Sequence, residues 1–99
     1  MPTPDINQAL DKNYADASKG EVINVKINAS AAGSLVKVKV YNLTGEHIRD
    51  FEFTTAGPGW NQAPWDLKNN AGKTVGQGIY FVRIEAEGEA VIRKVYIIK

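Results

Sequence analysis

Apolar and polar residues alternate along several short stretches of the chain. From Ile23 to Ala29 every second residue is aliphatic, and the residues between are asparagine or lysine. From Val36 to Tyr41 three valines alternate with two lysines and a tyrosine. A period of two residues is the pattern of a β-strand with one buried face. A strand with polar or charged residues on one face and branched aliphatic residues on the other is typical of antiparallel sheets solvated on one side. Both stretches are therefore predicted to be half-buried strands.

Two strands with irregular features are expected downstream. In the stretch 48–55, Ile48 and Phe51 lie three residues apart and can share a face only if the strand is irregular, for which a β-bulge is the expected form. The stretch 60–65 is expected to be a short strand that contains Pro64. Because proline has no backbone N–H, Pro64 confines this strand to a sheet edge or marks a strand start.

The end of the chain is expected to form a hairpin. Two strands, 79–86 and 90–98, flank a Glu-Gly-Glu turn. In the second strand Arg93 falls on the apolar face, in phase with the valines and the isoleucine around it. In the first strand one face carries Tyr80, Val82, Ile84 and Ala86.

The segment between these groups of strands is predicted to form a sheet corner. A strand closes at Trp65 and Asp66, a tight turn follows over 69–72, and a second turn lies at 76–78. In total, about seven short strands separated by turn signals predict an all-β fold, an antiparallel two-sheet sandwich. A small barrel remains the alternative, because periodicity alone does not separate the two architectures.

Residues 1–19 are predicted to be a linker, an N-terminal arm or a short edge strand, and the folded domain is predicted to span 20–99. Two prolines among the first four residues disfavour an early helix, although Asp5 is a suitable N-cap. At most one short helical turn is expected before Gly20. The initial Met-Pro-Thr-Pro has the character of a linker, so we expect the domain to come from a larger protein whose export signal lies outside it.

Composition narrows the functional classes. The length of 99 residues suits one small domain with a single core. Twelve Lys and Arg against eleven Asp and Glu leave a net charge of +1, and the basic residues are scattered, so nucleic acid is not expected as a partner. The chain has no cysteine, which excludes disulfides and thiolate metal sites. No stretch approaches the roughly 18 apolar residues of a membrane helix, so membrane insertion is not expected.

The chemically active side chains form no catalytic or metal-binding pattern. His47 is the only histidine and lies beside a turn, and no serine has a G-x-S-x-G context. Glu85, Glu87 and Glu89 alternate around a turn without a calcium-loop pattern, and they are expected to be a solvated hairpin end. We therefore predict that the chain is not an enzyme and that it has no catalytic residue, metal site or cofactor.

Aromatic residues are the remaining candidates for binding. An exposed ring on the outer face of a sheet can stack on a sugar or pack against a protein, and Tyr41, Trp60, Phe81 and Tyr96 are candidates for such positions. Trp60 and Phe81 are the predicted ligand or partner contacts. The competing interpretation is that they are packing residues, with Trp60 capping the end of the core after its Gly-Pro-Gly loop.

Three segments of the chain resemble one family of domains. They are VKVYNLTGEHIRDF, WDLKNNAGKTVGQGIYFVRIEA and the closing IRKVYIIK. Together they are similar to the bacterial immunoglobulin-like domain of the flagellar hook-capping type, which is itself related to the C-terminal sorting domains of type IX secretion. The resemblance covers roughly residues 20–99. Its landmarks are Trp65-Asp66, Gly72, Gly78-x-Tyr80 and Tyr41-Asn42-Leu43-x-Gly45.

The resemblance implies an immunoglobulin-like β-sandwich and structural roles for its landmark residues. Trp65 would belong to the core, Asp66, Asn70 and Gly72 would shape a turn, and Tyr80 would open a core strand. The landmark glycines Gly45 and Gly78 would be structural as well. The chain departs from the family before its first strand, where members often carry an Asn-Pro-x-x-Pro type of segment that is missing from residues 13–17.

The resemblance also implies a function. Such domains usually form the C-terminal, non-catalytic module of a larger bacterial secreted or cell-surface protein, with a structural, attachment or export role. The implied location is extracellular or at the cell surface, and the implied partners are other domains of the same protein, secretion machinery or a cell-surface component. The alternatives are a type IX sorting signal proper and a carbohydrate-binding accessory module of a secreted hydrolase.

Overall fold

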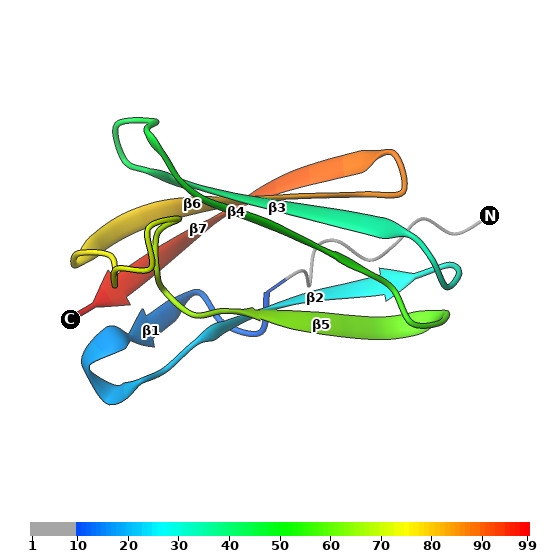
Figure 1. The fold of residues 1–99 in the computed structure, drawn as a ribbon, viewed down its shortest axis with the longest axis horizontal. Coiled ribbons are helices and arrows are strands. Elements are labelled where there is room, and N and C mark those ends of the chain that lie inside the picture. The colour runs from blue at the N-terminus through cyan, green and yellow to red at the C-terminus, as the bar shows by residue number, and fades with distance from the viewer. Residues whose placement is uncertain (1–9) are drawn as a thin grey trace.

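The computed structural model describes residues 10–99, which form seven strands and one 3₁₀ turn (Figure 1). Five strands form one sheet in the order β1-β7-β6-β3-β4, and β2 pairs with β5 in a second sheet. These are two separate layers, so the fold is the predicted all-β sandwich and not a small barrel. The elements are β1 (Tyr14–Asp16), η2 (Ala17–Lys19), β2 (Ile23–Ala29), β3 (Leu35–Asn42), β4 (His47–Thr54), β5 (Gly59–Trp65), β6 (Gly78–Ala86) and β7 (Glu89–Ile98).

The irregularity predicted in the stretch 48–55 is a β-bulge in β4. Along the ladder between β3 and β4, Val40 pairs with Arg49, but the next residue, Tyr41, pairs with His47. Ile48 is therefore the extra residue on β4. The bulge lets Ile48 and Phe51 both pack against the core, although their spacing does not fit a regular strand.

β5 lies at a sheet edge, as the proline in it predicts. Its single ladder is with β2, where Pro64 stands opposite Asn24, and no second described strand pairs with β5. Proline is tolerated at such an edge because one side of the strand forms no ladder.

The core lies between the two sheets and is built by the alternation seen in the sequence. In β2 every second residue is buried, and in β6 the buried residues are those from Tyr80 to Ala86 that share one face. Trp65, at the end of β5, is fully buried, and its ring meets that of Tyr80 edge to face with the centroids 6.2 Å apart. The indole Nε1 donates to the carbonyl of Lys68 at 3.0 Å, so the one polar atom of the side chain is satisfied.

The chain before β2 contributes to the core as well. β1 runs parallel to the end of β7, with Tyr14 opposite Tyr96, whereas the other strand pairs are antiparallel. Between the two sheets, Ala15 of β1 is fully buried. The domain boundary at Gly20 stays a prediction, and the helix signal at Asp5 lies outside the described residues.

The short helical element η2 connects β1 to β2. It begins at the N-cap Asp16, whose carboxylate accepts a hydrogen bond from the Ser18 N–H at 2.9 Å. It ends at Gly20, whose φ of 71° suits the left-handed end of a helical turn. In the part of the chain that the structure describes, no helix is long and apolar enough to cross a membrane.

Candidate interaction site

The side chains available for chemistry are dispersed over the surface. Among residues 10–99, no three His, Asp or Glu side chains come together in a way that could hold a metal ion. His47 is exposed, its Nε2 lies 3.7 Å from Asp50 Oδ1, and its ring centroid lies 5.6 Å from that of Tyr41. This arrangement provides a surface contact with a carboxylate when the imidazole is protonated.

Asp66 holds the turn that follows β5. Its Oδ1 accepts hydrogen bonds from the Lys68 N–H and from Arg49 Nη1, each at 3.1 Å. Because Arg49 belongs to β4 in the five-stranded sheet, this ion pair connects the two layers at one edge. Both side chains are partly exposed, so the pair adds little to stability and mainly fixes the geometry of the corner.

The turn that contains Gly72 is fastened to the edge of β4. The Gly72 N–H donates to the Asn69 carbonyl at 2.9 Å, and the φ of Gly72 is 82°, in the left-handed region that glycine adopts without strain. Asn70 Oδ1 accepts from the Asp50 N–H at 3.1 Å, and its Nδ2 donates to Asp50 Oδ1 at 2.8 Å. These polar groups are therefore engaged in shaping and positioning the turn.

Gly45 lies in the turn between β3 and β4. Its N–H donates to the Asn42 carbonyl at 3.0 Å, and its φ of 88° favours glycine. Asn42 Oδ1 accepts hydrogen bonds from the N–H groups of Thr44 and Glu46, and these bonds stabilise the turn.

Gly78 and Tyr80 lie at the start of β6. Gly78 is the first residue of the strand and pairs with Ile97 of β7. Tyr80 is 8% exposed, and its hydroxyl donates to the Gly76 carbonyl at 2.8 Å, which fastens the preceding segment to the strand. Burial raises the pKa of the Tyr80 hydroxyl, so the group stays a neutral donor at physiological pH.

Trp60 is accessible on the outer face of the two-stranded sheet. It is 49% exposed and stands opposite Asn28 in the ladder between β2 and β5. Lys26 Nζ lies 5.5 Å from the centroid of the indole ring, which is a cation–π distance. A ligand that stacks on Trp60 would therefore share the ring with a lysine of the chain.

Phe81 lies on the outer face of the other sheet. It is half-buried in β6, between Tyr41 of β3 and Lys94 of β7. Trp60 and Phe81 are thus on opposite outer faces of the sandwich, and they do not form one binding site. Each would have to contact a ligand or partner separately.

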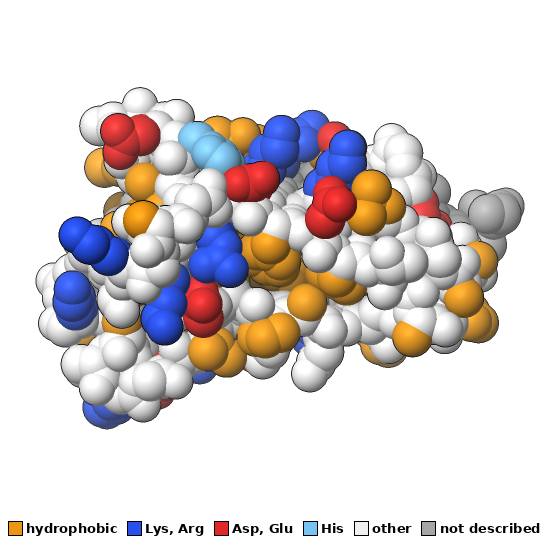
Figure 2. All heavy atoms as spheres, in the orientation of Figure 1, with side chains coloured by type: hydrophobic (Ala, Val, Ile, Leu, Met, Phe, Trp, Pro, Cys, Tyr) orange, Lys and Arg blue, Asp and Glu red, His pale blue; other side chains and the backbone are white. Residues whose placement is uncertain are grey.

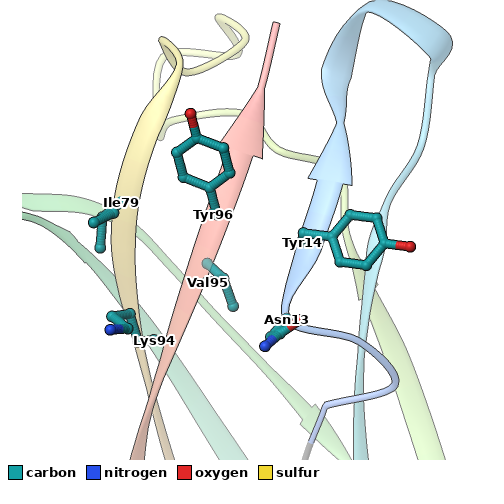
Figure 3. Close-up of a pocket in the computed structure, with 6 residues that line it drawn as sticks. All are labelled: Asn13, Tyr14, Ile79, Lys94, Val95 and Tyr96. Atoms are coloured by element: carbon teal, nitrogen blue, oxygen red, sulfur yellow. The ribbon is translucent and has the colours of Figure 1, made fainter.

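A groove at β1 and β7 brings together aromatic residues that are far apart in the sequence. Tyr14 pairs with Tyr96, and Tyr96 pairs with Ile79, so these three side chains form a row across β1, β7 and β6 (Figure 3). Tyr14 is 57% exposed and Tyr96 is 43% exposed. The groove has a volume of about 310 Å³ and is lined by Asn13, Tyr14, Ile79, Lys94, Val95 and Tyr96.

Sequence reasoning identified Tyr96 as a candidate for an outer sheet face but missed Tyr14. The segment around Tyr14 shows no alternation, because β1 has only three residues and is placed by its pairing with β7. The available signal was an isolated aromatic residue in an otherwise polar segment, which by itself does not indicate a strand.

Glu87 also has partners that the sequence did not reveal. Its carboxylate accepts hydrogen bonds from Ser30 Oγ at 2.7 Å, from the Ser30 N–H at 3.0 Å and from Ser34 Oγ at 3.1 Å. The Ser30 hydroxyl, the Ser30 N–H and the Ser34 hydroxyl together lower the pKa of this carboxyl. Glu87 therefore links the turn after β6 to the loop after β2 while it stays at the exposed end of the hairpin.

Charges of both signs are interspersed on the surface. On the face shown in Figure 2, Lys and Arg side chains alternate with Asp and Glu, and hydrophobic side chains lie in the hollow between the two layers. That face therefore carries no field of a single sign.

Comparison with solved structures finds the same sandwich within several bacterial proteins. One is the dimeric latent PorU from Porphyromonas gingivalis, which is 20% identical with a TM-score of 0.69 over 90% of this chain and 9% of PorU. Another is PorZ from the same organism, 16% identical with a TM-score of 0.59 over 91% of this chain and 11% of PorZ. A third is FlgD from Xanthomonas campestris, 16% identical with a TM-score of 0.58 over 78% of this chain and 57% of FlgD.

These structural similarities establish the fold, and a match to a family model establishes the family to which the chain belongs. The chain spans only about a tenth of PorU and of PorZ. No protein of curated function matches it significantly in sequence. The model of the FlgD Ig-like domain matches residues 11–90, which is most of the chain. The chain therefore belongs to the FlgD Ig-like domain family.

Proposed function

We propose that the chain is a non-catalytic C-terminal module of a larger bacterial secreted or cell-surface protein, with a structural, attachment or export role. The observation that carries the proposal is that a domain with this fold forms about a tenth of PorU and of PorZ. PorZ is described as an essential bacterial surface component of the type IX secretion system. A domain with this fold therefore occurs as a small part of larger proteins, as the proposed module role requires.

The contacts of the polar landmark residues support a role without catalysis. Asp66 is hydrogen-bonded to Arg49, and Asn70 is hydrogen-bonded to Asp50, and both contacts shape the corner between the sheets. Glu87 is bonded to two serines. By contrast, the exposed aromatic residues have the accessibility that a binding role requires, and Tyr14, Tyr96 and Trp60 are the clearest examples.

Deletion of the module from the protein that carries it would test this role. The expected result is that the location or the lifetime of the protein changes, while the activity of its other domains persists in the purified protein. The proposal is contradicted if the deletion abolishes that activity and leaves location and lifetime unchanged.

Export is the finer role that the similarity to PorZ favours. An export machinery would read the folded domain at its surface, in the turns at Gly45 and Gly78 and along the closing segment 93–99. A truncation of that segment is a poor test, because Val95 and Ile97 are only 1% and 0% exposed and their loss would unfold the domain. Substitutions of exposed residues avoid this problem.

The export role can be tested with a folded passenger that carries a signal peptide, in a bacterium with type IX secretion. The complete chain is fused to the C-terminus of the passenger, and the fraction digested by protease added to intact cells is measured. The passenger alone and a fusion with Trp65→Ala, which disrupts the core, are the controls. A larger digested fraction for the intact fusion than for both controls supports export, and equal fractions in all three exclude it.

A further inference from the structure

The groove at β1 and β7 is an aromatic surface that the sheet itself builds. Tyr14 of β1 pairs with Tyr96 of β7, and Tyr96 pairs with Ile79 of β6. The residue that follows each of them in its strand is buried, so the alternation of a strand places all three side chains on the outer face. Tyr14 and Tyr96 are 57% and 43% exposed, so both rings are accessible to a ligand.

Both tyrosine rings present a face to the groove. Figure 3 looks onto the groove and shows the rings of Tyr14 and Tyr96 nearly face-on, in a row across neighbouring strands. The Tyr96 N–H donates to the Asn13 carbonyl at 2.8 Å, which fixes the two strands that carry the rings. The face of an aromatic ring carries partial negative charge and attracts groups with partial positive charge, such as C–H groups. The groove therefore offers a platform to a flat ligand that has C–H groups on its faces.

Polar side chains without a partner stand beside the rings. Asn13 and Lys94 line the groove and are exposed. Within residues 10–99, the side-chain amide of Asn13, Lys94 Nζ and the two phenol hydroxyls form no hydrogen bond or ion pair with the chain. Such groups can exchange bound water for the hydroxyl groups of a ligand. Lys12 and Arg93, which have partners in the chain, do not belong to this lining.

The size of the groove favours a slender ligand over a folded protein. Its volume of about 310 Å³ is at the lower end of the range for small-ligand sites, about 300 to 1,000 Å³. A stable protein partner generally engages roughly 20 to 30 residues on each side, whereas the groove is lined by six residues. The occupant that fits these limits is a chain molecule that lies across the strands with only a few of its units in the groove.

We infer that the groove at β1 and β7 binds an extended, flat, β-linked polysaccharide. Each pyranose ring of such a chain has C–H groups on its faces and hydroxyl groups at its edges. The faces would stack on Tyr14 and Tyr96, and the edges would form hydrogen bonds with Asn13 and Lys94. An α-linked chain coils, so it would not keep successive faces on two rings of one sheet. The inference deepens the proposed function, on which it rests, by naming the chemical class of the attachment partner.

Titrations of the complete chain, followed by amide chemical shifts in NMR spectra, test the inference. The probes are cellohexaose and chitohexaose, which are flat β-linked chains, and the control is maltohexaose, an α-linked chain of equal length. At least one probe should shift the amides of Tyr14, Lys94 and Tyr96, with a dissociation constant in the millimolar range or below. Maltohexaose should bind at least about tenfold more weakly. Amides of β2 and β5 should keep their chemical shifts.

Substitutions of the two tyrosines separate stacking from general apolar contact. Tyr14→Leu and Tyr96→Leu keep apolar side chains on the sheet but remove the rings, so each should weaken probe binding by about fivefold or more. Tyr14→Phe and Tyr96→Phe keep the rings and should bind within about twofold of the unmodified chain. Leu35→Ala is the control, because Leu35 is 45% exposed in the same sheet but lies outside the groove. Dispersed amide spectra verify that every variant is folded.

Several results would overturn the inference. They are no shifted amide with either flat probe at several millimolar, shifts confined to β2 and β5 around Trp60, equal binding of maltohexaose, unchanged binding by both leucine variants, or dimerisation through the groove without sugar in sedimentation experiments. The deletion experiment on the larger protein is independent of all these measurements. A chain that binds neither probe can still be the proposed module, and a chain that binds a probe fails as the proposed module if its deletion leaves location and lifetime unchanged.

Discussion

Replacing either tryptophan of β5 by alanine gives a controlled measure of the core. Trp65 is fully buried, packs edge to face against Tyr80 and donates a hydrogen bond to the Lys68 carbonyl. Trp60 lies on the same strand, is 49% exposed, and has Lys26 beside its ring. The chemical change is identical in the two variants, so a difference in stability reports the difference in environment.

The expected magnitudes are well separated. Truncation of a large buried aromatic residue costs about 3 to 5 kcal/mol, which is a large part of the roughly 5 to 15 kcal/mol that stabilises a domain. In a domain of this size each kcal/mol corresponds to about 4 to 8 °C in midpoint, so Trp65→Ala should melt about 12 to 40 °C lower than the unmodified chain. Trp60→Ala should cost less than about 1 kcal/mol, including its contact with Lys26.

The assay is urea unfolding followed by circular dichroism, with thermal unfolding as a second measurement. Trp65→Phe is included as a milder variant, in case Trp65→Ala is unfolded at all urea concentrations. It keeps an aromatic ring and loses the hydrogen bond to Lys68, so it should be destabilised less than Trp65→Ala. A loss below about 1 kcal/mol for Trp65→Ala, or equal losses for Trp60→Ala and Trp65→Ala, would refute the assignment of Trp65 to the core.

Three further predictions concern the turns, the hairpin and metal ions. Gly45→Ala should lower the free energy of unfolding by about 1 kcal/mol or more, because the φ of Gly45 is 88°. Gly57→Ala should be nearly neutral, because Gly57 has no positive φ of this kind. Equal melting midpoints for the two variants would contradict this prediction. Glu87→Gln should destabilise the chain at neutral pH. Because the pKa of Glu87 in the folded chain is lowered from 4.5, the difference in stability between the variant and the unmodified chain should shrink as the pH falls below about 4.5. A difference in thermal melts that does not depend on pH would be inconsistent with the Ser30 contacts. Melting curves with chelator, calcium or zinc should coincide, and a rise of several degrees with either metal would reveal a site.

The regular part of the fold could be predicted because local patterns determine it. β2 and β3 follow from strict alternation, and the hairpin of β6 and β7 follows from two apolar stretches around Gly88. The bulge at Ile48 was also predictable, since the spacing of Ile48 and Phe51 conflicts with a regular strand. In each case the signal lies within about ten residues.

The groove at β1 and β7 could not be predicted because it depends on distant contacts. β1 has three residues, too few for a periodic signal, and it pairs with residues at the other end of the chain. The same limit applies to Glu87, whose bonds to Ser30 and Ser34 join segments more than fifty residues apart in sequence. Trp60 and Phe81 lie on outer sheet faces, but only the sheet order places them on opposite ones, and their role as ligand or partner contacts stays a prediction.

The parallel pairing of β1 with the end of β7 is the central structural claim, because the groove at β1 and β7 depends on it. Nuclear Overhauser effects between backbone protons of the two strands test it most directly. The account predicts contacts that link Tyr14 with Tyr96, Ala15 with Ile97 and Asp16 with Ile98, in parallel register. Contacts in antiparallel order, or contacts of residues 14–16 with residues 90–94, would contradict it.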